Sequence, residues 1–406
     1  MRSTAFDVIS LPRLASEAAA PSSRRARRYG RAAFAAALVF LAVAAMVVPA
    51  ALAQSPDTPV TIGAVSLAAA ARAETYWTDE RMRDARPMPV PELPQNQAAS
   101  LFGGAPAPAG LPVMGSSGAP GETPQEVVGD EVERLLQGPA PLFGAFPFSY
   151  TRYRLFPDLV STYKTFPYRA TGKLFFTIPG QGNFVCSAAS VNSANLAVVW
   201  TAGHCVYSQG IGFHTNFSFA PARRLANNPY GLWTPVPVNG VWTLAGWQGG
   251  LFNYDHGALV MKKNAGVKIG TKVGFLGFVA NVSRLQHWHL HGYPQGPRNL
   301  AQTPPGAQFD GVHHEICAAA WATDDQPGGA LDPPTVGVGC DKTGGTSGGP
   351  WVIDFSSASG ATNLLNGNNS YRYTGPNPPE NLKLYSPYFT TGAINLRNAA
   401  QAVPVP

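Results

Sequence analysis

Cys340-Asp341-Lys342-Thr343-Gly344-Gly345-Thr346-Ser347-Gly348-Gly349-Pro350 is the most informative segment of this chain, because it places one serine in a glycine-dense turn directly before an apolar strand. Glycine allows positive φ angles and the close approach of a substrate backbone. The backbone amides of Gly345 and Ser347 therefore predict an oxyanion hole, a pair of donors that stabilises the oxygen of an acyl-transfer intermediate. Because a serine alone is a poor nucleophile, this interpretation requires a base and an orienting acid elsewhere.

Both partners are present upstream of the serine. Thr201-Ala202-Gly203-His204-Cys205 follows the apolar run 196–200 and supplies a histidine. Asn253-Tyr254-Asp255-His256 places an aspartate at the start of a second apolar run. The chain order is thus His204, Asp255, Ser347, with separations of 51 and 92 residues that fit within one domain. Each motif alone is also typical of a tight turn or a strand cap, but the ordered set indicates nucleophilic catalysis.

These segments resemble those of the trypsin-like serine peptidases, which carry histidine, aspartate and serine in the same order on the chymotrypsin fold. The resemblance covers roughly 165–397. It implies an all-β fold of two six-stranded antiparallel β-barrels with the active site between them. It also implies that His204 is the general base and then acid, that Asp255 holds the imidazole tautomer, and that Ser347 attacks the acyl carbon. Proteins or peptides are the implied substrates, and no cofactor or metal is implied.

The chain departs from trypsin at the residue before the nucleophile, which is Thr346 where trypsin has an aspartate. Activation through a salt bridge to a new N-terminus is therefore not implied. The nucleophile turn is instead similar to that of the bacterial glutamyl endopeptidase branch, as is the segment 167–176. Glutamate selectivity in that branch uses a pocket histidine, and the best-matching segment, 364–371, has Asn369 in that place.

Three residues are candidates for the specificity pocket: Asp341, Asn369 and Ser370. Asp341 stands six residues before Ser347, where a trypsin carboxylate selects lysine or arginine. A carboxylate at the base of the pocket would favour a basic side chain. Asp341 as a simple loop cap is the other interpretation. A preference for basic side chains, for glutamate, and for small or apolar side chains all stay open at this point.

Length and composition describe what surrounds the catalytic region. The chain has 406 residues, 45% of them hydrophobic and 13% charged, which suits two or three units and one good core. Arginines in 24–31 precede the apolar run 32–48, and Ala51-Leu52-Ala53 offers small residues for cleavage, so 1–53 is predicted to be a signal peptide. An uncleaved membrane anchor is the alternative. We expect a secreted or periplasmic protein without membrane contact after signal cleavage.

Export makes disulfide bonds the expected state of the four cysteines. Cys186 and Cys205 bracket the segment that delivers His204, and the resemblance implies a bridge between them. Cys317 and Cys340 are then left to form a second bridge. A metal site is the alternative use of these cysteines, but the chain has no Cys-x-x-Cys spacing.

Residues 54–164 differ in composition from the rest of the chain. The stretches 87–94 and 105–120 are rich in proline, alanine and glycine, which predicts linker or disorder, whereas 127–136 has the pattern of a short acidic helix. Residues 54–164 carry 8 Lys and Arg against 12 Asp and Glu, a net charge of −4, while 165–406 carry 14 against 9, a net of +5. We expect 54–164 to be the pro-region of a zymogen that docks through charge; a solvated linker is the alternative.

Residues 165–406 show short apolar runs divided by glycine, proline and asparagine turns, which predict an all-β domain closed by a strand over 384–394. His287, His289 and His291 alternate along one run and would share one strand face, a geometry able to hold zinc. The alternative function is therefore a non-catalytic peptidase-fold protein that binds metal. Nucleic-acid binding is not expected, because the 14 basic residues are scattered over 242 positions.

Overall fold

The computed structural model describes residues 54–94, 100–101, 110–127, 149–155, 162–297, 308–327, 333–358, 361–374 and 382–406. The chain divides into two compact units, Met1–Ala51 and Leu52–Pro406, and all described residues belong to the second. The predicted signal peptide therefore lies outside the described residues, as does 128–136 of the predicted acidic helix. Within the described ranges, none of the helices has the length and apolar character needed to cross a membrane.

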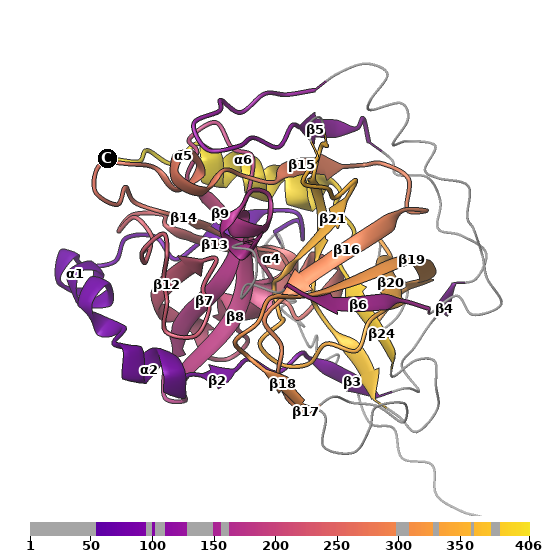
Figure 1. Cartoon of the computed structure of the whole chain (residues 1–406), viewed down its shortest axis with the longest axis horizontal. Coiled ribbons are helices and arrows are strands. Elements are labelled where there is room, and N and C mark those ends of the chain that lie inside the picture. Colours follow the sequence, from indigo (N-terminus) through magenta and orange to yellow (C-terminus); the bar gives the residue numbers. More distant parts are fainter. Residues whose placement is uncertain are drawn as a thin grey trace, which may run out of the picture. The chain divides into compact units, whose positions relative to one another are not determined.

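The first of two large sheets has eight strands, six of which come from the predicted catalytic domain (Figure 1). In spatial order they are β1 (Pro59–Thr61), β13 (Val241–Leu244), β14 (Gly257–Val260), β9 (Val198–Thr201), β8 (Gly182–Ser190), β7 (Thr171–Ile178) and β12 (Thr215–Pro221), with β2 (Arg86–Pro87) beside β8. The six catalytic-domain strands pair antiparallel, whereas β2 pairs parallel with β8. This sheet supplies His204 and Asp255.

The second sheet has ten strands and supplies Ser347. Its main path is β24 (Lys383–Ser386), β20 (Thr335–Gly339), β19 (Glu315–Asp325), β16 (His287–Gly292), β21 (Pro350–Ile353), β22 (Leu364–Asn368), β15 (Gly277–Ala280) and β5 (Val113–Gly115), with β4 (Ser100–Leu101) and β6 (Thr151–Arg154) beside β19. Only β15 and β22 pair in parallel among the described strands of this sheet. The predicted fold class, all-β with two antiparallel β-barrels, is confirmed.

Smaller elements connect or cover the sheets. The short ribbons are β10 (Tyr207–Ser208) with β11 (Gly212–Phe213), β17 (Gln295–Pro297) with β18 (Gln308–Asp310), and β3 (Glu92–Pro94) with β23 (Arg372–Thr374). The described helices are α1 (Leu67–Tyr76), α2 (Asp79–Asp84), α4 (Ala245–Gln248), α5 (Ile269–Val273) and α6 (Thr391–Gln401).

The first sheet is buried on both faces, which explains its nearly continuous apolar strands. Successive side chains of a strand point to opposite faces. In β8, Cys186 packs in the interior cluster of the sheet, whereas Val185 belongs to an outer cluster with Phe175, Trp77 and Met82. In Figure 1, α1 and α2 lie along this outer side of the sheet. The N-terminal region thus covers an apolar face of the predicted catalytic domain.

The expected linker at 87–94 and 105–120 differs from the structure where residues are described. Strand β2 reaches Pro87, and β3 and β5 lie within those stretches. The physical reason is burial: Val90 and Met114 are 4% and 2% exposed and pack in the core of the second sheet. Proline-rich composition gave no indication of these two apolar contacts.

The predicted closing strand over 384–394 is correct only in its first part. Strand β24 ends at Ser386, before Pro387, which has no amide to continue a ladder. Helix α6 then begins at Thr391. Ala393, Leu396 and Ala400 recur at helical spacing and pack in the core of the first sheet, so tertiary packing decides the helix.

Two disulfide bonds are present, Cys186–Cys205 and Cys317–Cys340, which is the pairing expected from the resemblance. The first joins β8 to the turn that carries His204. The second joins β19 to the start of the segment that leads to Ser347. Each bridge thus anchors one side of the predicted active site to a strand.

Replacing both Cys317 and Cys340 by alanine is expected to lower the free energy of unfolding by about 3 kcal/mol, since the bridge closes a loop of this size in the unfolded chain. Their separation is 23 residues. Equilibrium urea unfolding of the double variant and of the wild type measures the difference. A loss under about 1 kcal/mol would contradict the expectation that the bridge restrains the unfolded chain.

Candidate active site

His204 and Asp255 lie next to each other at one end of the first sheet. His204 follows β9 in a short 3₁₀ turn, and Asp255 precedes β14. The antiparallel register places Thr201 opposite Gly257 and so brings the two segments together. His204 Nδ1 lies 2.8 Å from Asp255 Oδ2, and the His204 amide donates to Asp255 Oδ1 at 2.7 Å. The carboxylate therefore fixes the position and the orientation of the imidazole.

Ser370, a candidate for the specificity pocket, contacts the same carboxylate. Its hydroxyl donates to Asp255 Oδ2 at 2.5 Å, and Asn368 Nδ2 donates to the Asp255 carbonyl at 3.1 Å. Burial raises the pKa of Asp255, but the charge of His204 and the hydrogen bonds from His204 and Ser370 outweigh it, so the pKa lies below its ordinary value. Asp255 is therefore ionised at neutral pH.

Ser347 is presented by a turn that requires glycine at two positions. Gly345 and Gly348 have φ angles of +85° and +74°. A Cβ at Gly348 would stand 1.9 Å from Thr201 Oγ1, so the close approach of the turn to the first sheet also excludes a side chain. Ser187 of β8 holds the turn in place, because its amide donates to the Ser347 carbonyl at 2.8 Å and its hydroxyl to the Gly345 carbonyl at 2.9 Å.

Asn369 braces the nucleophile turn from the second sheet. Its Nδ2 donates to the carbonyls of His291 and Thr346 at 2.8 Å each. Its Oδ1 accepts from Trp351 Nε1, also at 2.8 Å. The Asn369 side chain is fully buried, and its hydrogen bonds hold the nucleophile turn against the second sheet. Sequence reasoning placed Asn369 near the pocket but did not identify this role.

Asp341 is buried and has a cationic neighbour that the sequence interpretation missed. Arg152 Nε of β6 lies 3.5 Å from Asp341 Oδ1, and Arg152 Nη1 lies 3.0 Å from Glu315 Oε2. Arg154 Nε lies 2.7 Å from Glu315 Oε1. The alternating segment Thr151-Arg152-Tyr153-Arg154 had the pattern of an edge strand, but its pairing with β19 is a long-range contact. The carboxylate of Asp341 thus faces a guanidinium already present in the chain.

The histidines of β16 lie on a strand as predicted, and the rings of His287 and His289 lie 5.3 Å apart, but His291 is hydrogen-bonded to a histidine outside the strand. His291 Nδ1 lies 2.9 Å from His314 Nε2, and His313 Nδ1 lies 2.5 Å from Asp310 Oδ2. Among the described residues, the groups of three with metal-compatible spacing are Cys186, His204, Cys205 and Cys317, Cys340, Asp341. Both contain a disulfide bond, whose sulfurs are bonded to each other. In the described ranges, His287, His289 and His291 form no such group.

The N-terminal region reaches the nucleophile turn. The Gly345 amide, one of the two predicted oxyanion donors, donates to the Met88 carbonyl at 2.8 Å. Ser347 Oγ donates to the Pro89 carbonyl at 3.5 Å. His204 Nε2 is buried without a hydrogen-bond partner in the described part of the chain. A segment of the same chain therefore engages the predicted nucleophile and one of the predicted oxyanion donors.

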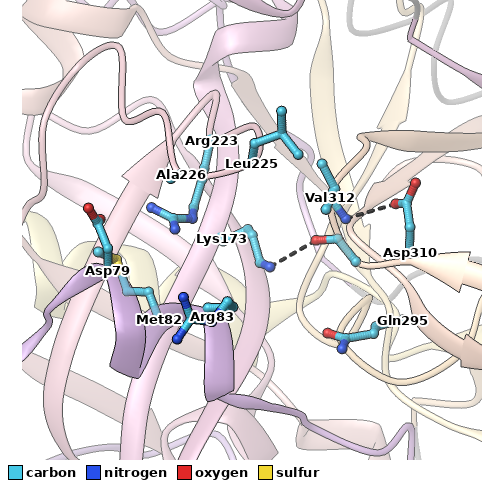
Figure 2. Close-up of a pocket in the computed structure, with 11 residues that line it drawn as sticks. Asp79, Met82, Arg83, Lys173, Arg223, Leu225, Ala226, Gln295, Asp310 and Val312 are labelled. Atoms are coloured by element: carbon cyan, nitrogen blue, oxygen red, sulfur yellow. Dashed lines mark hydrogen bonds between the residues drawn. The ribbon is translucent and has the colours of Figure 1, made fainter.

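A cavity of about 500 Å³ lies beside the nucleophile turn (Figure 2). One wall is α2 with Asp79, Met82 and Arg83, and Gln295, whose amide donates to the Gly344 carbonyl at 2.8 Å, belongs to the other wall. Figure 2 shows Lys173 of β7 between the walls, with its Nζ donating to the Gly311 carbonyl at 2.9 Å. Burial and the charge of Arg223 lower the pKa of Lys173 to about 7.

Lys173→Met is expected to raise the melting temperature at neutral pH by several degrees, because it removes the cost of burying the charged amine. The pKa of Lys173 is lower in the folded than in the unfolded state, so folding releases protons and wild-type stability rises from about pH 7 to 10. Thermal unfolding across that interval should show the two proteins converging at high pH. Parallel profiles would contradict this account, and Lys272→Met, at an exposed lysine, is the matched control.

No family model matches the chain. Its curated relatives include an extracellular metalloprotease of Bacillus subtilis (strain 168), 33% identical over 113 residues, and a glutamyl endopeptidase of Bacillus licheniformis, 29% identical over 138 residues. These alignments cover 27% and 33% of this chain and 34% and 39% of the relatives. The chain thus spans between a third and two fifths of the length of the curated relatives that it matches.

Solved structures give longer matches. The protease Anisep from Arthrobacter nicotinovorans is 33% identical, covers 58% of this chain and 96% of its own, and has a TM-score of 0.47. A thermostable serine protease, AL20, from an extremophilic microorganism is 32% identical, covers 58% of this chain and 98% of its own, and has a TM-score of 0.45. In both, the sequence likeness extends over nearly the whole solved protein.

Proposed function

We propose that this chain, which belongs to the trypsin-like serine peptidases of the chymotrypsin fold, is an exported serine endopeptidase that uses His204, Asp255 and Ser347. The observation that carries the proposal is the buried contact between His204 Nδ1 and the ionised Asp255, at 2.8 Å. This contact leaves His204 Nε2 to act as the base that the proposal requires, and the glycine turn presents Ser347 as the proposed nucleophile. A buried histidine with only a structural role would not require that turn.

The proposed reaction forms an acyl-enzyme. Ser347 Oγ attacks the carbonyl carbon of a peptide bond while His204 Nε2 takes the hydroxyl proton. Asp255 stabilises the imidazolium, and the amides of Gly345 and Ser347 donate to the developing oxyanion. His204 then gives the proton to the leaving amine, and a water activated by the same imidazole hydrolyses the ester.

Export and an N-terminal pro-region belong to the same proposal. A predicted signal peptide at 1–53 and two disulfide bonds support a secreted or periplasmic enzyme, because disulfides persist outside the reducing cytosol. Residues 54–164 are the proposed pro-region. The apolar cluster between α2 and the first sheet supports docking of this region on the catalytic domain.

The name of one relative, a metalloprotease, favours metal binding as the second candidate function. A zinc site needs three or four nitrogen, sulfur or oxygen ligands about 2 Å from one ion. His291 and His314 are instead hydrogen-bonded to each other, and burial keeps the pKa of both imidazoles low. We therefore prefer the serine mechanism.

For specificity, we propose a preference for small or apolar side chains next to the scissile bond. The pairing of Asp341 with Arg152 opposes selection of a basic side chain, and the contacts of Asn369 oppose its use as a glutamate ligand. Val90 follows Pro89, which contacts Ser347, and packs in the apolar core cluster of the second sheet. This supports an apolar surface beside the nucleophile turn.

Ser347→Ala and His204→Ala are expected to abolish peptide hydrolysis without loss of the fold, because neither removed group is a packing element of the core. Asp255→Asn is expected to lower turnover by about four orders of magnitude, since the imidazole tautomer is no longer held. Hydrolysis of a peptide substrate by the processed proteins, with circular dichroism as the folding check, measures both. Ser356→Ala serves as a matched serine control, and wild-type turnover in Ser347→Ala would reject the proposal.

Cleavage of a randomised peptide library is expected to show small or apolar residues before the scissile bond. Asp341→Ser should leave the ranking of preferred residues unchanged, because the Asp341 carboxylate is paired with Arg152 and does not select the substrate. A dominant signal for lysine or arginine that disappears in Asp341→Ser would instead assign Asp341 to the pocket. A dominant glutamate signal would show that another residue replaces the pocket histidine.

A further inference from the structure

Residues Arg86–Pro94, here called the strap, cross the predicted cleft from one sheet to the other. Strand β2, at the start of the strap, pairs in parallel with Phe184 and Val185 of β8. Strand β3, at its end, pairs in parallel with β23. Between the two, Met88 and Pro89 contact the nucleophile turn. The strap therefore passes over the nucleophile turn and is held at both ends by backbone pairing.

The strap engages the groups on which the proposed reaction depends. The Met88 carbonyl accepts a hydrogen bond from the Gly345 amide, and the Pro89 carbonyl lies 3.5 Å from Ser347 Oγ. The Met88 amide donates to the Val185 carbonyl at 2.9 Å. This bond fixes the position of the Met88 carbonyl, which accepts from Gly345. An oxyanion donor and the nucleophile are thus both engaged by the strap.

The direction of the strap is opposite to that of a productive substrate. The leaving amine of a substrate must receive a proton from His204, so the leaving group lies on the side of the first sheet and β8. The acyl half then lies on the opposite side, along β23, which pairs with β3 outside the ten-stranded sheet. A substrate therefore has its N-terminal half on β23, whereas the strap has its N-terminal half on β8.

Reversal explains how a peptide can fill this cleft and remain intact. The carbonyl held by Gly345 belongs to the bond between Met88 and Pro89. In the reversed direction the nitrogen of that bond points toward the second sheet, away from the acid that would protonate it. The nitrogen is also that of a proline, and Ser347 Oγ faces the next carbonyl along the strap. Neither attack nor departure of the amine is aligned.

The composition of the strap suits a fixed ligand. Prolines at 87, 89, 91 and 94 restrict φ and favour an extended backbone, which lowers the entropy lost on binding. Val90 between them is 4% exposed and packs in the core cluster of the second sheet. The Arg372 amide donates to the Pro91 carbonyl at 3.0 Å. The extended backbone of the strap and the buried side chain of Val90 together account for binding of the strap to the catalytic domain.

We propose that the strap is a built-in inhibitor, which blocks the cleft in the direction opposite to a substrate and so is not hydrolysed by the enzyme that it blocks. This inference rests on the proposed peptidase function, whose regulation it names. It also changes the physical basis expected for docking of the pro-region. The contacts at the cleft are backbone hydrogen bonds and apolar burial, so inhibition should vary little with salt, whereas charge-based docking would weaken as salt screens it.

The test is the rate at which a fluorophosphonate labels Ser347 in the full chain. Val90→Asp, which places a charge at the buried anchor, is expected to label about ten- to a hundred-fold faster than the wild type, because only molecules with a displaced strap react. Val90→Ile keeps the anchor and should label at the wild-type rate. Met88→Pro removes the amide that donates to Val185 and is the second displacing variant, with Met88→Leu as its control. Equal labelling of the wild type and both displacing variants would overturn the inhibitor.

A synthetic peptide of residues 85–94 provides the test of direction. Added to Val90→Asp, it should slow labelling to a similar extent at low and high salt and be recovered intact after long incubation. Cleavage of the peptide by Val90→Asp, but not by Val90→Asp carrying Ser347→Ala, would overturn the reversed direction. If Ser347 is labelled in no variant, the proposed peptidase function fails. Hydrogen exchange at the Arg372 amide then separates the two questions: loss of protection in Val90→Asp would show that the strap is displaced although no reaction is inhibited.

Discussion

The ionised carboxylate of Asp255 is the constraint on which the rest of the site depends. Removing an unpaired carboxylate from water costs several kcal/mol, so a fully buried one is retained only where donors surround it. The amide and imidazole of His204 come from the first sheet, and the hydroxyl of Ser370 comes from the second. Satisfying one charge therefore fixes the position of two sheets relative to the imidazole, and a shift of either sheet would leave Asp255 short of a donor.

The nucleophile turn is held by the same kind of contact between sheets. Ser187 of the first sheet donates to the turn through its amide and its hydroxyl, and Asn369 of the second sheet donates to it from the other side. None of these donors takes part in the proposed chemistry. They fix the direction of the Gly345 and Ser347 amides before a substrate arrives, which is the condition for strong stabilisation of an oxyanion.

The sequence was informative where function depends on local backbone. His204, Asp255 and Ser347 each stand at the junction of an apolar run and a turn, and short segments are enough to recognise such junctions. The assignment of Asn369 and Ser370 to a specificity pocket stays a prediction. Their contacts depend on which face of the strand each side chain takes, and one step along a strand reverses that face.

Long-range contacts could not be predicted from the same information. Val90 stands in a segment whose composition is typical of a linker, and Arg152 stands in a short alternating segment. Their roles depend on partners more than 150 residues away, such as Glu315 for Arg152. The run 384–394 was predicted as one strand, but the residues from Thr391 pack against the first sheet as a helix. Composition and periodicity do not indicate which distant residues a segment will contact.

Strand β6 bears on where the proposed pro-region would be cut. Arg152 and Arg154 lie against Glu315 and Asp341, whose side chains are 1% and 0% exposed. Removing one partner of a buried ion pair destabilises the fold, because the remaining charge stays buried. A mature enzyme that began after residue 154 would carry two such acids without these arginines. The proposed pro-region is therefore not uniform: its last strand supplies both arginines to Glu315, and a cut that left β6 in place would keep those ion pairs.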